Sequence, residues 1–400
     1  MEDVQVLLDE ARDLLTKSPS SSSSSPLPPS SPLPSSPPPL AHCSPEESPT
    51  SPKMHSKSGF FMDSKIVMYN GQVKLVYELN INDILMGDDS RPRQLLNKTK
   101  VKRENTHLYK LKQNKGCTYT LNQDNYICLK VSRLRAHENH TTVLGRQYNK
   151  NDCFDIRLSD YMKMSQRRKL DFKAYKTGVE FAYQPLCFDP YLFGLWVIDS
   201  STCTNEFTVS NIDILEECFN ICQSHKTSFN YFRDNKYAIE YDDDDKKDFN
   251  ECVLKKLGLV VDTSKKFIPL CYKANTKENR LKLLAGIIDC QGTCNNNCIE
   301  LTLKNELLVS DIMFLCNSLG FVTSKSNQKN RGGIRIVISG DLSIIPLINK
   351  KKILTDRKQV KNVLHTGFEV ETINDVNDCY ELVVDGNGRL LLEDFTVVHC

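Results

Sequence analysis

Two apolar runs in the sequence share a glycine near their start and a polar residue at their end. The first run is Leu192-Phe-Gly194-Leu-Trp-Val-Ile-Asp199, and the second is Leu284-Ala-Gly286-Ile-Ile-Asp289-Cys-Gln291. Aligned on Gly194 and Gly286, both runs have a polar residue at the eighth position, Asp199 in one and Gln291 in the other. A buried core helix would explain either run alone, but two in tandem form an internal repeat.

The spacing predicts a specific chemistry. Glycine inside an apolar helix lets a second helix approach closely, so Gly194 and Gly286 predict a pair of packed helices. Acidic residues at both helix ends would then lie beside a shared axis. Such paired carboxylates can hold divalent metal ions against a phosphodiester.

The elements around these runs change character along the chain. Strand patterns come first, including the hairpin Lys65–Tyr77 around Asn70-Gly71. Mixed elements follow, with helices expected at Asp213–Ser224 and Leu307–Leu319. The last 25 residues return to strand patterns. The order β, mixed α/β, β indicates one domain inserted into another.

These motifs resemble those of the intein-derived LAGLIDADG (DOD-type) homing endonucleases. The two runs resemble the paired LAGLIDADG motifs, and Phe267-Ile-Pro269 resembles the approach to the second. Ile66–Gly71 resembles the N-terminal splicing block of inteins, and Asp378–Val384 and Leu390–His399 resemble the two C-terminal blocks. The resemblance covers about Gly59 to Cys400, roughly 85% of the chain.

The resemblance implies a mixed α/β multidomain fold. An all-β Hint (hedgehog/intein) horseshoe would be interrupted by a two-repeat αββαββ-type endonuclease domain. The expected parts are a disordered Ser/Pro-rich head at 1–58 with an amphipathic helix at 2–16, the N-terminal Hint part with a basic DNA-recognition insertion at 59–182, the LAGLIDADG domain at 183–352, and the C-terminal Hint part at 353–400. Twelve of the 17 prolines lie in the head, between Pro19 and Pro52, which sets it apart from the body.

The positions that match splicing residues of the family have lost their chemistry. Gly59, or one of its neighbours Phe60 and Phe61, stands where the family has a nucleophile, and none of the three carries one. In the stretch that begins at Asn122, Asn125 stands where the family has a histidine, and an amide cannot shuttle a proton at neutral pH. His399 keeps the penultimate histidine, but Cys400 follows where the family has asparagine. Either that asparagine is deleted and Cys400 is the residue after it, or Cys400 replaces it. We expect splicing to be lost, with residual autoprocessing near Ser58 through His399 as a remaining alternative.

The nuclease positions depart from the family in part. Asp199 matches a metal ligand, while Gln291 is a neutral residue at the degenerate counterpart. Asp289 lies two positions earlier, where the family uses an aspartate to cap the helix. Lys266 matches a catalytic lysine, and Arg331 aligns weakly with a second one. Losing one carboxylate weakens a divalent-metal site, so cleavage should be weak or lost, and Mg²⁺ is the expected cofactor only if cleavage remains.

Composition limits the compartment and the partners. No apolar stretch approaches the roughly 18 residues of a membrane span, and the acidic start Met1-Glu-Asp-Val is no secretory signal. Sixteen cysteines without such a signal are expected to be reduced. We therefore expect an intracellular protein of the nucleus or cytoplasm, neither secreted nor membrane-bound. It should be a monomer, because both repeats lie in one chain.

Two hypotheses on function remain open. From Arg91 to Lys173 there are 20 Lys/Arg against seven Asp/Glu, which suits double-stranded DNA as a partner. The strands Lys236–Tyr241 and Ile334–Ile338 are candidates to enter the major groove. The first hypothesis is thus a homing-endonuclease-like DNA-binding protein with degenerate activities. The second is a non-enzymatic scaffold or interaction protein that uses a domesticated intein fold. Inserted-domain sheets without a basic outer face would favour the second.

Overall fold

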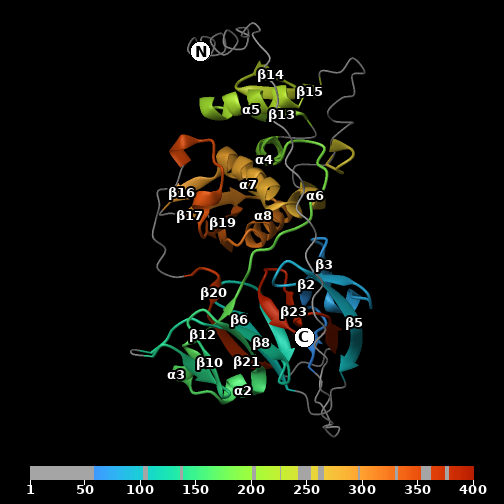
Figure 1. The fold of residues 1–400 in the computed structure, drawn as a ribbon. Helices are drawn as coiled ribbons and strands as arrows, with labels where there is room; N and C mark the ends of the chain where they lie inside the picture. Colours follow the sequence, from blue (N-terminus) through green and yellow to red (C-terminus); the bar gives the residue numbers. More distant parts are fainter. Residues whose placement is uncertain are drawn as a thin grey trace, which may run out of the picture. The chain divides into compact units, whose positions relative to one another are not determined.

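The computed structural model describes eleven stretches of the body of the chain. They are residues 58–101, 107–135, 138–200, 204–225, 227–241, 254–259, 265–295, 298–328, 332–352, 362–373 and 378–400 (Figure 1). The predicted head, its helix at 2–16 and Arg331 lie outside these residues. The described residues all belong to one compact unit, Ser56–Cys400. Within it the prediction of a mixed α/β fold with antiparallel sheets is confirmed.

The predicted hairpin at Asn70-Gly71 is present. Strands β2 (Lys65–Val67) and β3 (Val73–Leu75) pair antiparallel, with Ile66 opposite Lys74. Gly71 takes φ +85°, a conformation that glycine adopts without strain. A Cβ atom at Gly71 would also lie 2.2 Å from the Cβ of Ala274, so the turn packs closely against a segment far along the chain.

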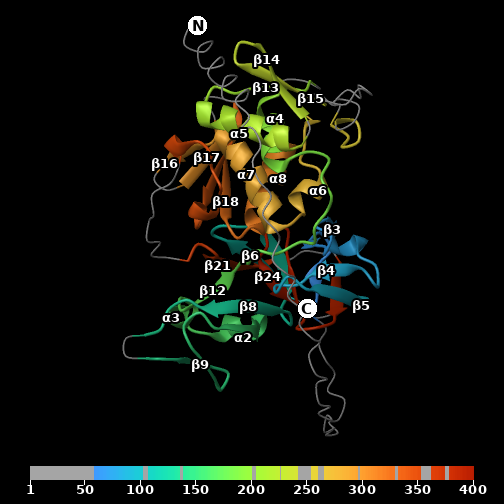
Figure 2. The ribbon, with the colours of Figure 1, turned by 45° about the horizontal axis from the view of Figure 1, so that its top comes forward.

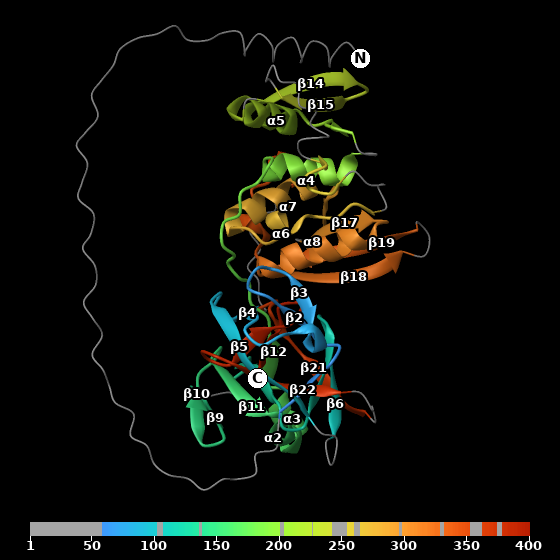
Figure 3. The same cartoon turned by 90° about the vertical axis from the view of Figure 1, so that its right-hand side faces the viewer.

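The first large sheet combines strands from both ends of the body. Its seven strands run in the order β21 (Phe368–Ile373), β6 (Leu108–Gln113), β7 (Thr118–Asn122), β1 (Phe60–Phe61), β22 (Cys379–Val384), β5 (Pro92–Val101) and β4 (Ile84–Met86). The late strand β22 thus lies between two early strands, with Tyr380 opposite Phe60 on one side and Lys100 on the other. Figure 3 shows the red strands β21 and β22 near the early strand β6.

A second sheet also places late strands beside early ones. Its order is β20 (His365–Thr366), β12 (Phe172–Tyr175), β8 (Tyr126–Val131), β24 (Val397–His399) and β23 (Arg389–Leu391), and β11 (Cys153–Arg157) also pairs with β8. Alternate residues of these strands, such as Ile127, Leu129 and Val398, are buried in one large hydrophobic core. The hairpin β9 (Thr141–Val143) and β10 (Arg146–Tyr148) and the short helices α2 (Leu158–Lys163) and α3 (Gln166–Lys169) lie between β8 and β12 in the sequence.

The two predicted apolar helices are α4 (Pro190–Asp199) and α7 (Lys277–Gln291). Asp189 caps α4 by accepting from the backbone N–H groups of Tyr191 and Leu192, and Pro190 suits the first turn because its missing N–H needs no partner there. Thr276 caps α7, because its side-chain oxygen accepts from the backbone N–H of Asn279. Nearly every residue of α4 is buried, as expected for a helix without a polar face.

Each long helix is followed by strands and a second helix. After α4 come β13 (Glu206–Thr208), α5 (Ile212–Ser224), β14 (Thr227–Arg233) and β15 (Lys236–Tyr241). After α7 come β16 (Thr293–Asn295), β17 (Cys298–Leu303), α8 (Glu306–Ser318), β18 (Val322–Gln328) and β19 (Gly333–Ser339). The second repeat thus shows the expected order αββαββ, while the described residues of the first show one strand before α5. Figure 2 shows α7 and α8 beside the strands of their repeat.

The short helix α6 (Leu270–Lys273) precedes α7, and the 3₁₀ turns Val76–Glu78 (η1), Leu342–Ile344 (η4) and Lys350–Lys352 (η5) complete the described elements. A shared core joins these parts: Val67, Phe181, Ala274, Phe314 and Phe395 belong to one cluster of buried side chains. The buried guanidinium of Arg280 donates to the carbonyls of Asn275 and Val179 and to the hydroxyl of Ser318. No helix among the described residues is long and apolar enough to cross a membrane.

Candidate functional site

Helices α4 and α7 cross at their two glycines. A Cβ atom at Gly194 would lie 2.4 Å from the carbonyl oxygen of Leu283, and one at Gly286 would lie 2.1 Å from that of Tyr191. No real Cβ atom tolerates such distances, so only glycine permits this approach. The structure therefore places both predicted motif glycines at the closest approach of the helices, and this crossing aligns the two helix ends.

The helix ends present Asp199 and Gln291 in equivalent positions. Asp199 is the last residue of α4; it is exposed, and its Oδ2 accepts from the backbone N–H of Thr208 at 2.6 Å. Gln291 is the last residue of α7, also exposed, and its Nε2 donates to the carbonyl of Thr302 at 3.2 Å. Each side chain is thus engaged with a strand of its own repeat, and only one of the two is charged.

Asp289 has a different place from both. It is buried, and its carboxylate accepts from the hydroxyl of Tyr191 at 3.0 Å and from the backbone N–H groups of Ile348 at 2.8 Å and Asn349 at 3.3 Å. Burial raises the pKa of Asp289 above its ordinary value, although these hydrogen bonds oppose the rise. Asp289 therefore ties α4 to α7 and to the segment before η5, and it does not face the open helix ends.

Two described lysines, Lys266 and Lys352, lie at these helix ends, and the sequence predicted a role only for Lys266. Lys266 is buried, donates to the carbonyl and hydroxyl of Ser200, and lies with its Nζ 4.6 Å from the ring centroid of Trp196. Lys352 was missed. Its Nζ donates to the carbonyls of Ile288 at 2.9 Å and Asp289 at 2.8 Å, where the α7 dipole favours a cation. The run Lys350–Lys352 was the available signal, but its contact with α7 is a tertiary one.

The residues present do not fit a divalent metal ion at the paired helix ends. Mg²⁺ needs hard, anionic oxygen ligands, and among the described residues Asp199 is the single carboxylate at the last positions of the two helices. Gln291 directs its amide nitrogen to Thr302, and Lys352 places a positive charge at the last carbonyls of α7. In the described part of the chain, no group of three or more His, Cys, Asp or Glu side chains is arranged to hold a metal ion.

The five residues that match splicing positions gather at the other candidate site. Gly59 is buried, and its carbonyl accepts from the backbone N–H of Asn122 at 3.2 Å. A Cβ atom at Gly59 would lie 3.1 Å from both Cys379 and Val101, tighter than most real contacts. The side chain of Asn122 accepts from the N–H of Asn125 at 3.0 Å. Gly59, at the start of the body, is thus closely packed against Asn122.

Asn125 and His399 keep polar atoms without partners. Asn125 is fully buried, and neither its Oδ1 nor its Nδ2 has a hydrogen-bond partner among the described residues, nor has the buried Nδ1 of His399. The ring of His399 lies 5.4 Å from that of Tyr126, which follows Asn125. Cys400 donates its N–H to Gly388, and burial raises the pKa of its thiol well above the ordinary value. This cluster offers neither a reactive thiolate nor a paired base.

The outer faces of the two inserted sheets are not basic. In β15, Lys236 and Glu240 alternate with the buried Tyr237 and Ile239, and Glu206 of β13 lies opposite Ala238 on the same face. In β19, Arg335 lies next to the buried Ile336, points to the other face of the sheet and forms an ion pair with Glu300 of β17. The candidate strands Lys236–Tyr241 and Ile334–Ile338 therefore lie in faces where acidic residues balance the basic ones. The lack of a basic outer face favours the scaffold hypothesis for these sheets.

The insertion between β8 and β12 is where the described basic residues cluster. Arg133, Arg135 and Arg168 all approach the buried carboxylate of Asp171, at 3.1, 3.9 and 3.9 Å. One negative charge thus holds three positive ones, and Arg133 and Arg135 are exposed. Arg168 also donates to the carbonyl of Thr142 in β9. We name Arg133, Arg135, Arg168 and Asp171 the arginine cluster.

Comparison with solved structures finds similarity to inteins over about a quarter of the chain. The structure of the MchDnaB-1 intein matches with 13% identity and a TM-score of 0.17, covering 24% of this chain and 79% of that one. The gp41-1 intein matches with 11% identity and a TM-score of 0.16, covering 26% and 81%. No protein-family model matches the sequence. No curated protein matches it either. The resemblance to endonucleases stays a prediction.

Proposed function

We propose that this is an intein-derived, homing-endonuclease-like protein that acts by binding double-stranded DNA without cutting it. The observation that carries the proposal is the asymmetry of the helix ends. Asp199 offers a carboxylate, whereas Gln291 offers a neutral amide already bound to Thr302. Two metal ions held between paired carboxylates would stabilise the charge that develops on a phosphodiester, and this chain lacks one of the pair.

The same proposal holds that splicing is absent. An acyl shift at the start of an intein needs a side-chain nucleophile, and Gly59 has no side chain. Asn125 cannot act as a proton shuttle, and burial keeps the thiol of Cys400 protonated at neutral pH. His399 keeps the imidazole of the family position, and no nucleophile of the cluster is activated for it.

The arginine cluster supports DNA as the partner. Asp171 orders the three guanidinium groups, so less side-chain freedom is lost when they meet phosphates. The excess charge of the cluster remains after pairing with Asp171, and further exposed cations of the insertion, Arg146, Lys150 and Arg167, add to it. A row of phosphates is the partner that such an unbalanced surface attracts.

The test is a titration of the full chain with a labelled DNA duplex at several salt concentrations. We expect log K to fall linearly with log salt. The double variant Arg133→Gln, Arg135→Gln should make this slope shallower by about 2, since each phosphate contact contributes about 0.9. Arg335→Gln, the same change on the outer sheet face, is the matched control and should leave the slope unchanged.

Cleavage is measured on the same preparations. Supercoiled plasmid incubated with Mg²⁺ or Mn²⁺ should remain intact in both cases. Nicking that depends on Asp199 would contradict the loss of cleavage, and a salt slope that responds to Arg335 and not to Arg133 and Arg135 would contradict the assignment to the arginine cluster.

A protein partner is the second candidate, and the charge-balanced sheet faces favour it. Paired charges such as Glu300 and Arg335, with neutral Thr302 and Val337 beside them, suit a protein surface better than a phosphate backbone. Absence of any salt-dependent DNA binding, together with an intact fold, would select this scaffold function.

A further inference from the structure

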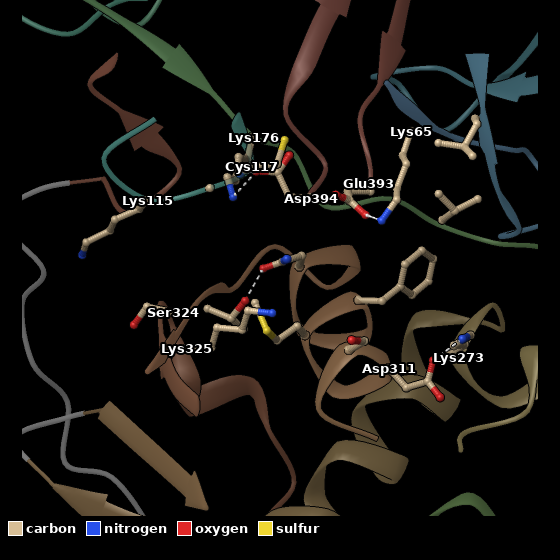
Figure 4. Close-up of a pocket in the computed structure, with 18 of the residues that line it drawn as sticks. Lys65, Lys115, Cys117, Lys176, Lys273, Asp311, Ser324, Lys325, Glu393 and Asp394 are labelled. Carbon is tan, nitrogen blue, oxygen red and sulfur yellow. Dashed lines mark hydrogen bonds and ion pairs between the residues drawn. The ribbon is translucent and has the colours of Figure 1, made fainter. Parts of the chain in front are cut away.

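A large polar cleft lies between the first strands of the body and helix α8. Its volume is about 790 Å³, within the range of roughly 300–1,000 Å³ found for small-molecule sites. Lys65, the loop Asn114–Cys117 and Glu393–Asp394 form one wall, and Lys273, residues of α8 and the start of β18 form the other (Figure 4). The cleft takes no part in the binding surface or the helix ends described above.

Three of its lysines are neutralised within the walls. Lys65 pairs with Glu393 at 2.9 Å, Lys176 with Asp394 at 2.9 Å, and Lys273 with Asp311. Lys176, Asp394 and Asp311 are each more than nine-tenths buried, so these charges are fixed parts of the structure rather than mobile surface groups. Asp394 also accepts from the N–H of Cys117 at 2.7 Å.

Two further lysines are not neutralised. Among the described residues, neither Lys115 nor Lys325 has a carboxylate within ion-pair distance. Figure 4 shows Lys325 reaching into the space between the walls, while Lys115 lies at its edge. Lys325 is opposite the buried Ile336 in the sheet register, which turns its side chain away from the outer sheet face and towards the cleft. With Glu78 counted among the lining residues, the cleft has five lysines against four carboxylates and so keeps a small excess of positive charge.

We propose that the cleft binds a small organic anion, with its phosphate or carboxylate group on Lys325. Ammonium groups bind such oxyanions as point charges through charge-assisted hydrogen bonds. The carboxylates of Glu393 and Asp311 and the hydroxyl of Ser310 supply acceptors for hydroxyl or amino groups of the same molecule. Met313 and Phe314 supply an apolar contact.

The ligand is a small molecule rather than a nucleic acid. Three of the lysines each have a wall carboxylate within ion-pair distance, so a continuous row of phosphates along the cleft would meet repulsion beside these pairs. A compact anion with one charged end and polar groups at the other meets the charge pattern without this conflict. Binding here is therefore independent of the arginine cluster.

The experiment is calorimetric titration of the full chain with inorganic pyrophosphate and, separately, with citrate. Saturable binding of either probe is expected, and the stronger one identifies the phosphate or carboxylate class. Lys325→Gln should weaken it about tenfold, the cost of losing one charge-assisted bond. Ser310→Glu, a change at an exposed helix position that folding tolerates, places a carboxylate at the cleft and should abolish binding.

Lys304→Gln is the matched control, because Lys304 is exposed on the same repeat and does not line the cleft. It should leave the affinity unchanged. The proposal is overturned if neither probe binds at millimolar concentration, or if binding is equally strong in the Lys325→Gln and Ser310→Glu variants, since the anion would then lie elsewhere.

Discussion

Gly194 and Gly286 meet at the crossing of α4 and α7, where a Cβ atom at Gly286 would lie 3.1 Å from the Cα atom of Gly194. The crossing is enclosed by backbone atoms, since the nearest neighbours of both glycines are carbonyl, amide and Cα atoms of the other helix. Backbone cannot move aside as a side chain does. The relative position of Asp199 and Gln291 therefore depends on Gly194 and Gly286, because the side chain of each glycine is only a hydrogen atom.

Gly286→Ala should destabilise the protein by about 3 kcal/mol or more, because α7 must move away from Tyr191 to admit the methyl group. Denaturant-induced unfolding measures the change. Gly367→Ala is the control: its Cβ would meet the end of the Asn114 side chain at 2.9 Å, which can rotate away. Equal effects of both substitutions would show that the helix crossing is not the cause.

Asp394→Asn should cost about 3–5 kcal/mol, because it leaves the ammonium of Lys176 buried without a counter-charge. Adding Lys176→Met to this variant removes the unpaired charge and should recover most of the loss. A double-mutant cycle on the free energy of unfolding measures the coupling. Additive effects of the two substitutions would mean that the buried pair is not coupled.

The same pair predicts a pH dependence. Burial alone would raise the pKa of Asp394, but the charge of Lys176 and hydrogen bonds from Lys176, Cys117 and Thr396 lower it below its ordinary value. The stabilisation is therefore complete above about pH 4, the ordinary range of aspartate, and is lost as the pH falls through the lower folded-state pKa. Unfolding measured from neutral to acidic pH should show a smaller decline in Asp394→Asn than in the natural chain.

Gln291→Asp should create divalent-metal binding that the natural chain lacks. Without metal, the new carboxylate lies at the negative end of the α7 dipole, near Asp199, and should lower stability by about 1 kcal/mol. Mn²⁺ should restore the melting temperature of this variant and leave that of Gln291→Asn unchanged. A melting temperature of Gln291→Asp that ignores Mn²⁺ would mean that the two helix ends are not close enough to share an ion.

Asn125→Leu should be neutral or stabilising, within about 1 kcal/mol, because the amide it removes is buried without hydrogen bonds. Asn122→Leu should cost about 1 kcal/mol, because it removes the side-chain acceptor of the Asn125 N–H and leaves only its longer bond to the carbonyl of residue 122, 3.3 Å against 3.0 Å. Unfolding of the two variants side by side tests the difference. A large loss in Asn125→Leu would reveal that the amide holds a buried water molecule.

Local sequence signals predicted much of this fold. Asn70-Gly71 predicted a hairpin through its turn preference, and the hairpin is present. The helical spacing of Ile214, Cys218 and Cys222 predicted α5, and all three side chains are buried on that helix. The glycines of the apolar runs predicted packed helices for a steric reason, and the packed helices are there. The family resemblance implied that Asp289 caps a helix, whereas its carboxylate accepts from the backbone N–H groups of Ile348 and Asn349, which lie outside α4 and α7.

Local sequence signals could not predict the features that depend on tertiary contacts. Lys352 lies 61 positions beyond Gln291 in the sequence, and nothing local links it to the end of α7. The sharing of Asp171 among Arg133, Arg135 and Arg168 arises because β8 and α3 are brought together by β12. The net charge of the two outer sheet faces depends on which residues of each strand point outward, and pairing fixes that register.

The interleaving of β22 and β24 with early strands has a consequence for biosynthesis. β1, β5 and β8 leave the ribosome long before the strands that separate or flank them, while the strands from β13 to β19 pair only with one another. The middle of the chain can therefore mature first, and the outer sheets wait with open edges until the last strands arrive. During that interval the nascent chain is exposed to wrong pairing, and this is when a chaperone would matter most.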